Sequence, residues 1–235
     1  MKCQLVMSVV ERNEKFLNRM YRSVIKRLVD IILSLLGIVV LSPIMLIIAI
    51  AIRIDDKGTI LFRQERVGKH KETFQIWKFR TMLMSAPKDT PTHLFKTPAK
   101  YITRVGRILR KSSLDELPQL FQILSGKMTI VGPRPALWNQ DDLVAERDKH
   151  TYLNETVNDL TPGLTGWAQI NGRDELPIDV KAKLDGEYLK RLSFLFDIRC
   201  FFGTFISVLK GRGILEGGTD ADQENSANTY DGSKP

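Results

Sequence analysis

Two adjacent carboxylates, Asp115 and Glu116, lie in the segment SSLDELPQL at residues 112–120, between a basic stretch and Pro118. One interpretation is structural, because acidic residues in a first helical turn interact favourably with the helix dipole. Either Ser113 forms a capping box with Glu116, or Asp115 is the cap and brings Pro118 into the first turn, where proline is tolerated. The other interpretation is chemical, with one carboxylate as a reagent. The local sequence favours the structural role, so the choice depends on the rest of the chain.

The positive charge of the chain is concentrated in one block. The 235 residues carry a net charge of +8, and 43% of them are apolar, which is normal for a folded protein. From residue 53 to residue 111 there are 15 basic and 5 acidic residues, so this block contains the whole excess. Such a concentration of basic residues is typical of a surface that binds phosphate groups, either on a nucleic acid, on an anionic membrane or on a nucleotide. No nucleic-acid recognition motif accompanies it, and we expect no nucleic-acid partner.

An uncharged, strongly apolar run at residues 31–52 precedes the basic block. It is long enough for a helix that crosses a bilayer, and a single-pass anchor is the simplest interpretation. Two features favour re-entry instead. Both flanks are basic, whereas a spanning helix concentrates lysine and arginine on the cytoplasmic side. In addition, Pro43 removes a backbone hydrogen bond in the middle of the run, and Ser42 offers a hydroxyl to the freed backbone groups.

These features predict a helix–break–helix at Ser42 and Pro43 that enters one membrane leaflet and leaves it by the same face. The basic block then lies on the cytoplasmic surface, where each lysine or arginine contributes about 1 kcal/mol of attraction to anionic lipid. We divide the chain accordingly into four parts: an N-terminal arm (1–24), a re-entrant membrane hairpin (25–53), a cytosolic domain (54–212) and a disordered tail (213–235).

The predicted fold class is α+β and mainly helical, with short strands and interfacial amphipathic helices. Residues 59–68 and 72–82 read as two strands around a turn. Apolar residues at helical spacing predict three helices: 100–112, 117–124 and 178–192. Gly126 is a natural stop for the second of them. The aromatic segment 198–210 is too short to span a membrane, and is either a core helix or a helix in the membrane interface.

Six motifs follow one another along the chain: the apolar run with Ser42-Pro43, FRQERVG, KFRTM, LDELPQL, VGPRP and PGLTGWAQINGR. Each is weak alone, but together they closely resemble the small monotopic phosphoglycosyl transferases of the bacterial sugar transferase family. The resemblance extends from about residue 26 to residue 210 and makes 54–212 a catalytic domain. It implies transfer of a sugar-1-phosphate from a UDP-sugar to undecaprenyl phosphate, with release of UMP.

The resemblance also implies a cellular setting. Members of the family begin the assembly of a capsule, an exopolysaccharide or an O-antigen at the cytoplasmic face of the bacterial inner membrane. They are described as entering a single leaflet at the Ser-Pro pair, which agrees with the re-entry predicted from charge and proline. A homodimer is an open alternative.

The resemblance gives the acidic pair its chemistry. Both substrates carry phosphate, and charge repulsion opposes direct attack of one on the other. A carboxylate nucleophile divides the reaction into two displacements through an aspartyl-phosphate intermediate. By resemblance, Asp115 is this nucleophile and a ligand of Mg²⁺, with Mn²⁺ as the alternative metal. Glu116 assists either the metal or the incoming lipid phosphate.

Candidates for phosphate binding come from these motifs and from the basic segment just before LDELPQL. Arg110 and Arg134 are favoured because a guanidinium holds phosphate through two hydrogen bonds. Lys78 and Arg80 are candidates either for this role or for contact with lipid headgroups. The last motif supplies contacts to nucleotide or sugar at three polar positions: Gln169, Asn171 and Arg173. Trp167 in that motif is either a further contact or a core side chain.

Two other functions remain open. A non-catalytic membrane scaffold for polysaccharide assembly would use the same basic surface without needing the acidic pair. A single-pass anchored glycosyltransferase would release UDP instead of UMP. The motifs do not identify the sugar, which is a hexose or an N-acetylhexosamine; the last motif is more similar to members that use N-acetylated sugars.

Overall fold

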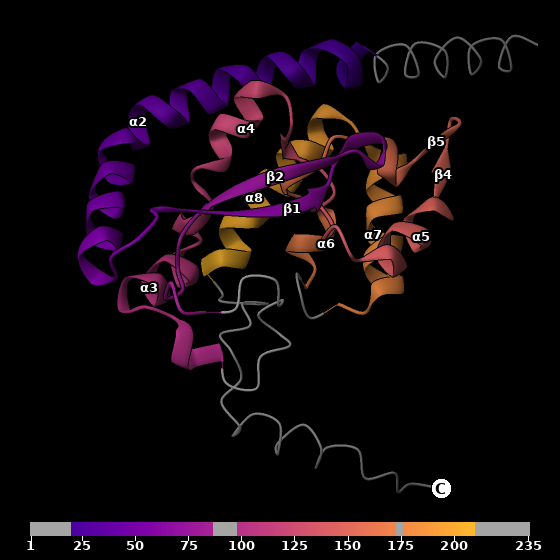
Figure 1. The fold of residues 1–235 in the computed structure, drawn as a ribbon. Coiled ribbons are helices and arrows are strands. Elements are labelled where there is room, and N and C mark those ends of the chain that lie inside the picture. Colours follow the sequence, from indigo (N-terminus) through magenta and orange to yellow (C-terminus); the bar gives the residue numbers. More distant parts are fainter. Residues whose placement is uncertain (1–19, 87–97, 173–175, 210–235) are drawn as a thin grey trace, which may run out of the picture.

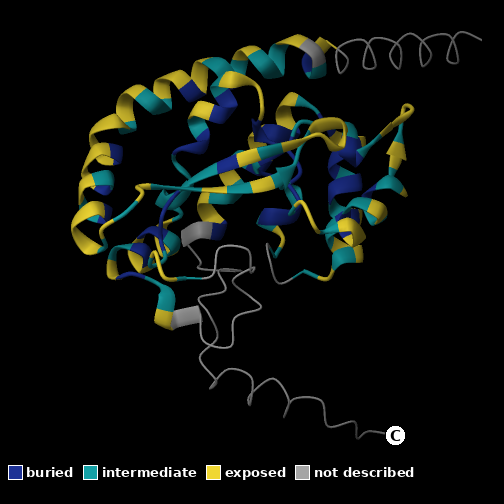
Figure 2. Ribbon diagram, in the orientation of Figure 1, coloured by how far each residue is buried: buried dark blue, intermediate teal, exposed yellow. Residues whose placement is uncertain are grey.

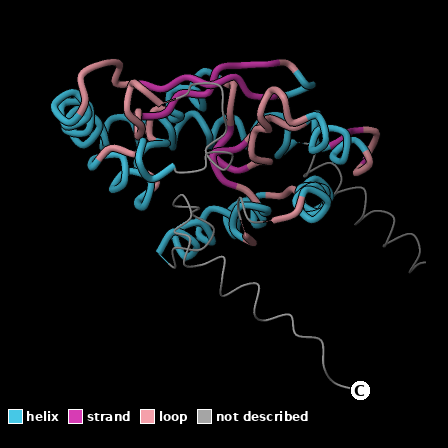
Figure 3. The backbone as a smooth tube through the Cα atoms, turned by 60° about the horizontal axis from the view of Figure 1, so that its bottom comes forward, coloured by secondary structure: helices cyan, strands magenta, loops and turns pink. Residues whose placement is uncertain are grey.

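The computed structural model describes residues 20–86, 98–172 and 176–209. The predicted tail, most of the predicted arm and Arg173 lie outside these residues. The described part is mainly helical, and its strands form three two-stranded sheets (Figure 1). Figure 3 shows that helices make up most of the fold, with strands confined to short stretches. The predicted class, mainly helical α+β, is confirmed.

One long helix, α2 (Lys26–Asp55), curves over the outside of the domain (Figure 1). A π-helical turn, η1 (Tyr21–Ile25), leads into it. Pro43 lies inside α2, and the structure continues through it as one bent helix instead of two separate helices. A proline at position 43 leaves the carbonyl of Val39 without its usual N–H partner. The Ser42 hydroxyl donates to this oxygen at 2.9 Å, as expected for the predicted use of that side chain.

The two sides of α2 differ in their surroundings (Figure 2). The side facing the domain carries the buried residues of the helix: Asp30, Ser34, Met45, Ile48 and Ile52. Large apolar side chains cover the other side, and Ile32, Val39 and Ile47 are more than 60% exposed. Within the described residues, α2 is the one helix long and apolar enough to cross a membrane. Its exposed side is therefore suited to contact with lipid.

The first half of α2 is attached to the domain by polar contacts. Arg27 donates to the carbonyl oxygens of Ile123 (2.6 Å) and Leu124 (2.7 Å) at the end of the helix α4 (Gln119–Ser125). The buried Asp30 accepts from the Thr129 hydroxyl (2.6 Å) and the Ile130 N–H (2.9 Å) on strand β3 (Thr129–Val131). An apolar helix thus uses a buried carboxylate to bind the backbone of a strand.

The other end of α2 is attached to the same domain. Asp55 accepts from the backbone N–H of Val105 at 3.0 Å, in the first turn of α3 (Arg104–Ser112). Asp56, directly after α2, forms an ion pair with Arg80 at 2.9 Å. Between the two ends, Met45, Ile48 and Ile52 pack with Phe79 and Leu109. The domain therefore contacts α2 along its whole length.

The two predicted strands form an antiparallel hairpin, β1 (Leu61–Val67) and β2 (Thr73–Phe79), around the short helix η2 (Lys69–Lys71). The hairpin is joined to α4 by Gln122. The Gln122 side chain accepts from the Trp77 N–H at 2.9 Å and donates to the Gln75 carbonyl oxygen at 2.6 Å. It therefore occupies the hydrogen-bonding positions that a further strand would use at this edge. Gly126 ends α4 in the left-handed conformation (φ 87°), as predicted.

A parallel pair of strands brings two distant motifs together. Strand β3 runs into VGPRP and pairs with β6 (Gly163–Thr165) of the last motif. Gly132 donates to the Thr165 carbonyl oxygen at 2.7 Å. A Cβ at Gly166 would lie 2.1 Å from the Gly132 carbonyl oxygen, so the two chains approach each other only because glycine occupies this position.

The remaining elements surround this pair of strands. In chain order they are η4 (Pro98–Tyr101), η5 (Leu114–Glu116), α5 (Asp141–Asp148), β4 (Thr151–Tyr152), β5 (Glu155–Thr156), η6 (Val157–Asp159), α6 (Trp167–Ile170), α7 (Ile178–Arg191) and α8 (Phe194–Leu209). The predicted helices over 100–112 and 178–192 correspond to α3 and α7. Helix α8 contains the aromatic segment: Cys200 is buried, as expected of a core helix, whereas Phe202 and Phe205 are 60% and 55% exposed. A place for this helix in the membrane interface stays a prediction.

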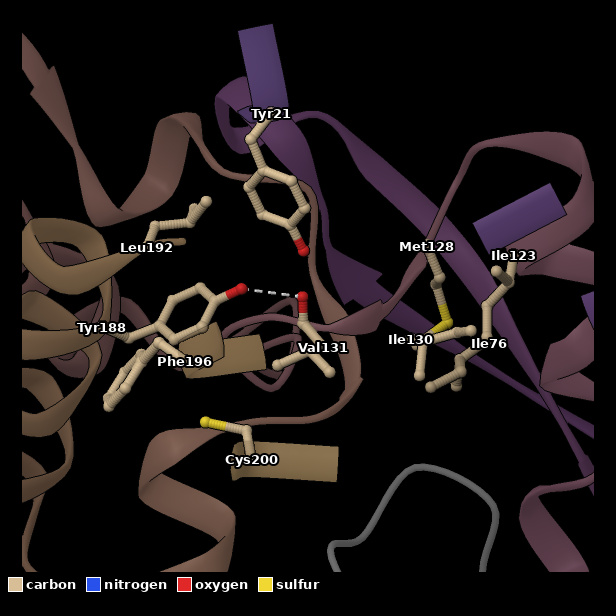
Figure 4. Close-up of a cluster of buried hydrophobic side chains, with 10 residues drawn as sticks. All are labelled: Tyr21, Ile76, Ile123, Met128, Ile130, Val131, Tyr188, Leu192, Phe196 and Cys200. Carbon is tan, nitrogen blue, oxygen red and sulfur yellow. Dashed lines mark hydrogen bonds between the residues drawn. The ribbon is translucent and has the colours of Figure 1, made fainter. Parts of the chain in front are cut away.

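The largest apolar cluster joins the start of the chain's described part to its end (Figure 4). The Tyr188 hydroxyl reaches both the Val131 carbonyl oxygen (3.0 Å) and the Asp197 carboxylate (2.7 Å). The same carboxylate accepts from the Tyr21 hydroxyl at 2.6 Å and pairs with Lys26. Because Asp197 lies in α8 and Lys26 begins α2, this buried network fixes the long apolar helix to the C-terminal helices.

We predict that Asp30→Ala lowers the free energy of unfolding by about 1–3 kcal/mol, because it leaves the Thr129 hydroxyl and the Ile130 N–H buried without their acceptor. Thermal unfolding in detergent measures the change. The control is Ile32→Ala, which removes an exposed apolar side chain from the same helix. Equal destabilisation by the two variants would contradict a specific role for the Asp30 carboxylate.

Candidate active site

The acidic pair lies in its own short turn. Residues Leu114–Glu116 form the 3-10 helix η5, between α3 and α4. Ser113 ends α3 in the left-handed conformation (φ 57°), and its side chain caps nothing in η5. Helix α4 begins only at Gln119, with Pro118 as its N-cap residue and no side-chain cap. The predicted capping roles of Ser113 and Asp115 are therefore wrong, and neither acidic side chain is used to start α4.

Glu116 lies between two cations from different motifs. Its Oε1 accepts from Lys78 Nζ at 2.7 Å and from Arg134 Nη2 at 3.1 Å. Lys78 belongs to KFRTM on β2, and Arg134 belongs to VGPRP after β3. Burial opposes ionisation of Glu116, but the charges and hydrogen bonds of the two cations outweigh it and hold its pKa well below the ordinary value. Glu116 is therefore an anion that pairs with both cations, and the three groups together keep a net charge of about +1.

Asp115 lies in the same cluster, and the surroundings of its carboxylate differ from those of the Glu116 carboxylate. Burial raises its pKa, and the neighbouring Glu116 adds to this, while the charges of Lys78, Arg110 and Arg134 act in the opposite direction. Among the described residues, none donates a hydrogen bond to the Asp115 carboxylate. The pair is thus asymmetric: one carboxylate is occupied by cations, and the other lies among cations and is open to a ligand.

Arg110 is placed beside the pair, as predicted. Its Nε donates to the Thr81 hydroxyl at 2.9 Å, which leaves the rest of the guanidinium available. Burial lowers its pKa, and the charge of Asp115 opposes this shift. The acidic pair is therefore influenced by three cations from separate segments, Lys78, Arg110 and Arg134. All three are candidates for phosphate binding from the sequence, and that role stays a prediction.

Arg80 has different surroundings. It is 6% exposed, and it donates to both the Asp56 carboxylate and the Asp56 carbonyl oxygen. These contacts join β2 to the end of α2. Its predicted contact with phosphate stays a prediction, and its observed partners indicate a structural contribution.

The Arg134 corner is held in place by residues that the sequence did not single out. Arg147 donates to the Arg134 carbonyl oxygen at 2.9 Å. Arg147 is itself held by Asp185 in α7 through two hydrogen bonds, of 2.9 and 2.6 Å, in a fully buried ion pair. Arg66 of the FRQERVG motif donates to the next carbonyl, that of Pro135, at 3.2 Å. These contacts fix the backbone from which Arg134 reaches Glu116.

The polar residues of the last motif make local contacts. Gln169 is buried and donates to the Leu164 carbonyl oxygen at 3.1 Å, and Asn171 donates to the Trp167 carbonyl oxygen at 2.7 Å. The Trp167 ring packs against Phe196 at 5.0 Å between centroids. Trp167 therefore has the core position that was its alternative interpretation. Contacts of Gln169 and Asn171 with nucleotide or sugar stay predictions, and Arg173 lies outside the described residues.

Comparison with known proteins agrees with the order of the motifs. Residues 21–211 match the family described as bacterial sugar transferase. The chain belongs to this family.

Several relatives in the family carry a named activity. The chain is 36% identical over 195 residues to the UDP-glucose:undecaprenyl-phosphate glucose-1-phosphate transferase of Escherichia coli K12. It is 34% identical over 192 residues to the UDP-N-acetylgalactosamine-undecaprenyl-phosphate N-acetylgalactosaminephosphotransferase of Aeromonas hydrophila. Both matches cover 80% of this chain but only 40% and 44% of the relatives. A match that covers most of both proteins is the uncharacterized sugar transferase EpsL of Bacillus subtilis, 35% identical over 82% of this chain and 91% of the relative.

In this bacterial sugar transferase, the acidic pair was predicted to bind a metal ion, and that binding stays a prediction. Within the described ranges, no group of three or more His, Cys, Asp or Glu side chains is placed to hold a metal by itself. Mg²⁺ does not need one, because it commonly binds through one or two carboxylates, substrate phosphates and water. The open carboxylate of Asp115 fits this requirement, whereas Glu116 already binds two cations.

We predict that Glu116→Gln is less stable than the wild type at neutral pH, because Lys78 and Arg134 then face each other without an anion. A carboxylate whose folded-state pKa is depressed contributes stability above its ordinary pKa and loses it as the pH falls through the folded-state pKa. The difference in unfolding temperature should therefore be constant near neutrality and shrink below the ordinary value of 4.5. Melting curves over this pH range measure it, with the exposed Glu65→Gln as the control. A difference that grows in acid would exclude this role for Glu116.

Proposed function

We propose that this chain transfers a sugar-1-phosphate from a UDP-sugar to undecaprenyl phosphate and releases UMP. The observation that carries the proposal is the asymmetric pair, in which Glu116 holds Lys78 and Arg134 while Asp115 stays open beside them. The E. coli and A. hydrophila relatives support it, since both are named for transfer from a UDP-sugar to undecaprenyl phosphate. Their names differ in the sugar, so we propose a hexose or N-acetylhexosamine.

The first step is attack by an Asp115 carboxylate oxygen on the β-phosphorus of the UDP-sugar. The new O–P bond forms as the bond between the β-phosphorus and the bridging oxygen breaks, and UMP leaves with the electron pair. Lys78, Arg110 and Arg134 stabilise the negative charge that accumulates on the phosphoryl oxygens and the leaving group. Mg²⁺, held by Asp115 and the substrate phosphates, adds further neutralisation when bound.

In the second step, a phosphate oxygen of undecaprenyl phosphate attacks the same phosphorus. The bond to Asp115 breaks, and the carboxylate returns to its starting state while the sugar remains on a lipid pyrophosphate. The two steps need no general base, because the attacking groups are anions. Glu116 acts as a positioning residue in both: it keeps Lys78 and Arg134 in place, so that they remain between the anions and reduce their repulsion.

Asp115→Asn tests the nucleophile. We expect a loss of lipid-linked product of roughly 10³-fold or more, since removal of a covalent nucleophile is among the most damaging active-site changes. The exchange of labelled UMP into UDP-sugar, which needs only the first step, should be lost as well. Asp141→Asn, an exposed carboxamide substitution in α5, is the matched control.

The products separate this function from its alternatives. Undiminished UMP release by Asp115→Asn in the presence of undecaprenyl phosphate would overturn the assignment of the nucleophile. Release of UDP by the wild type would indicate a glycosyltransferase that moves the sugar alone. A wild type inactive across a panel of UDP-hexoses and UDP-N-acetylhexosamines would favour the scaffold.

We further propose that α2 re-enters one leaflet and that the catalytic domain lies on the cytoplasmic face of the bacterial inner membrane. A helix that crosses a bilayer has its ends on opposite surfaces. In this chain, Arg27 and Asp30 near one end and Asp55 and Asp56 at the other bind one folded domain. The exposed apolar side of the bent helix between them suits immersion from a single surface, and the basic block favours the cytoplasmic one.

Labelling of single cysteines tests this topology. In a background with Cys3 and Cys200 replaced by serine, Val24→Cys and Lys57→Cys should both resist an impermeant maleimide added outside spheroplasts and both react after lysis. Both positions are exposed in the structure, so protection reports the membrane side instead of burial in the fold. Reaction of one site but not the other from outside would show that the helix spans the membrane.

A further inference from the structure

Gln119, the first residue of α4, carries a buried amide that the described fold leaves without a hydrogen-bond acceptor. The residue is 1% exposed, and none of the described residues accepts a hydrogen bond from its Nε2. A buried donor without an acceptor lowers the stability of the folded protein, and native structures leave few side-chain donors in this state. An unpaired donor beside an active site is therefore a candidate for binding a ligand.

Gln119 lies in the middle of a row of three side chains. The backbone N–H groups of Glu116, Leu117, Leu120 and Phe121 each donate to the carbonyl three residues earlier, at 3.1–3.3 Å. In a segment with this hydrogen-bond spacing, side chains three residues apart lie above one another. Glu116, Gln119 and Gln122 are spaced in this way and therefore share one face of the segment.

The partners of the two outer side chains locate the middle one. Glu116 accepts from Lys78 Nζ at 2.7 Å, and the Gln122 amide binds the backbone of β2 at 2.9 and 2.6 Å. The Gln119 amide is enclosed between these two contacts, on the face that is turned to β2. It also follows Asp115 by four residues, a spacing that makes two side chains neighbours on a helical segment. The unpaired donor thus lies beside the open carboxylate.

We propose that Gln119 is a further catalytic residue, whose amide donates a hydrogen bond to a non-bridging oxygen of the phosphoryl group that Asp115 receives. The proposal rests on the proposed function and adds a neutral donor to the cations of the site. Since the same phosphoryl group is bound to Asp115 after the first step and leaves it in the second, the hydrogen bond acts in both steps. A donor that is already buried and fixed needs no reorganisation when negative charge develops on this oxygen.

Gln119→Met tests the effect on catalysis, because it removes the amide and keeps an unbranched side chain of similar size. The kcat for exchange of labelled UMP into UDP-sugar should fall roughly tenfold or more, while the KM for UDP-sugar changes little, since the donor acts on charge that develops in the transition state. Formation of the lipid-linked product should fall by a similar factor, because both steps use the same oxygen.

Unfolding temperature separates this role from a structural one. Gln119→Met should unfold at the wild-type temperature or above it, because the lost donor has no acceptor among the described residues. Gln122→Met is the matched control for stability and should unfold at a lower temperature, since its amide makes two hydrogen bonds to β2. Gln75→Met makes the same chemical change at an exposed side chain and should alter neither the UMP exchange nor the unfolding temperature.

Three results would overturn the proposal. The first is a wild-type kcat for UMP exchange in Gln119→Met. The second is a fall in its unfolding temperature as large as that of Gln122→Met, which would assign the amide to the fold. The third is a loss of lipid-linked product with UMP exchange preserved, which would assign the amide to the acceptor alone. An absence of UMP exchange in the wild type would instead overturn the proposed function.

Discussion

The ion cluster at Glu116 joins three segments that are far apart in the sequence. Its carboxylate binds a lysine from the hairpin and an arginine from the corner after β3, and the turn η5 supplies the carboxylate itself. Without this shared anion, the two partly buried cations would repel each other, which would favour separation of the segments that carry them. Because Glu116 pairs with both cations, the neighbouring Asp115 is not needed as their counter-ion. The cluster thus allows two adjacent carboxylates to have different electrostatic states.

The remaining packing supports this cluster from two sides. On one side, the buried pair of Arg147 and Asp185 fixes the backbone of Arg134. On the other, α2 holds the domain through Asp30, which binds strand β3 just before the same corner. A buried carboxylate in an otherwise apolar helix is costly unless it is fully hydrogen-bonded. Its two strong donors meet that condition and also fix the rotation of α2, so that the apolar side faces outward.

Local patterns predicted the elements well, and distant pairings poorly. The strands of the hairpin and the helices α3, α4 and α7 follow from apolar spacing and from stops such as Gly126, because these signals are contained in a few neighbouring residues. The pairing of β3 with β6 could not be predicted, since strands of three residues show no useful alternation. The capping prediction failed for a related reason: Ser113 adopts a left-handed conformation that ends one helix, which no propensity at this position indicates.

The site was predicted in part. Lys78, Arg110 and Arg134 lie around the acidic pair. Lys78 and Arg134 belong to two of the six motifs, and Arg110 was selected because it shortly precedes LDELPQL. Arg147 and Asp185 were missed because each is one charged residue among many in a charged helix, and only the tertiary structure shows that they are buried together. Trp167 had two open interpretations, and its packing against Phe196 favours the core. Its neighbours Arg191 and Arg199 lie over the same ring system, a contact without a local sequence signal.

The contact of Gln122 with the edge of β2 has a consequence for register. A shift of β2 by one residue would turn every side chain of the strand to the opposite face. Lys78 would then leave Glu116, and Trp77 or Phe79 would take its place. The Gln122 amide binds the Trp77 N–H and the Gln75 carbonyl oxygen, and both contacts would be lost after a one-residue shift. An uncharged glutamine in α4 thus favours the register that presents Lys78 to Glu116.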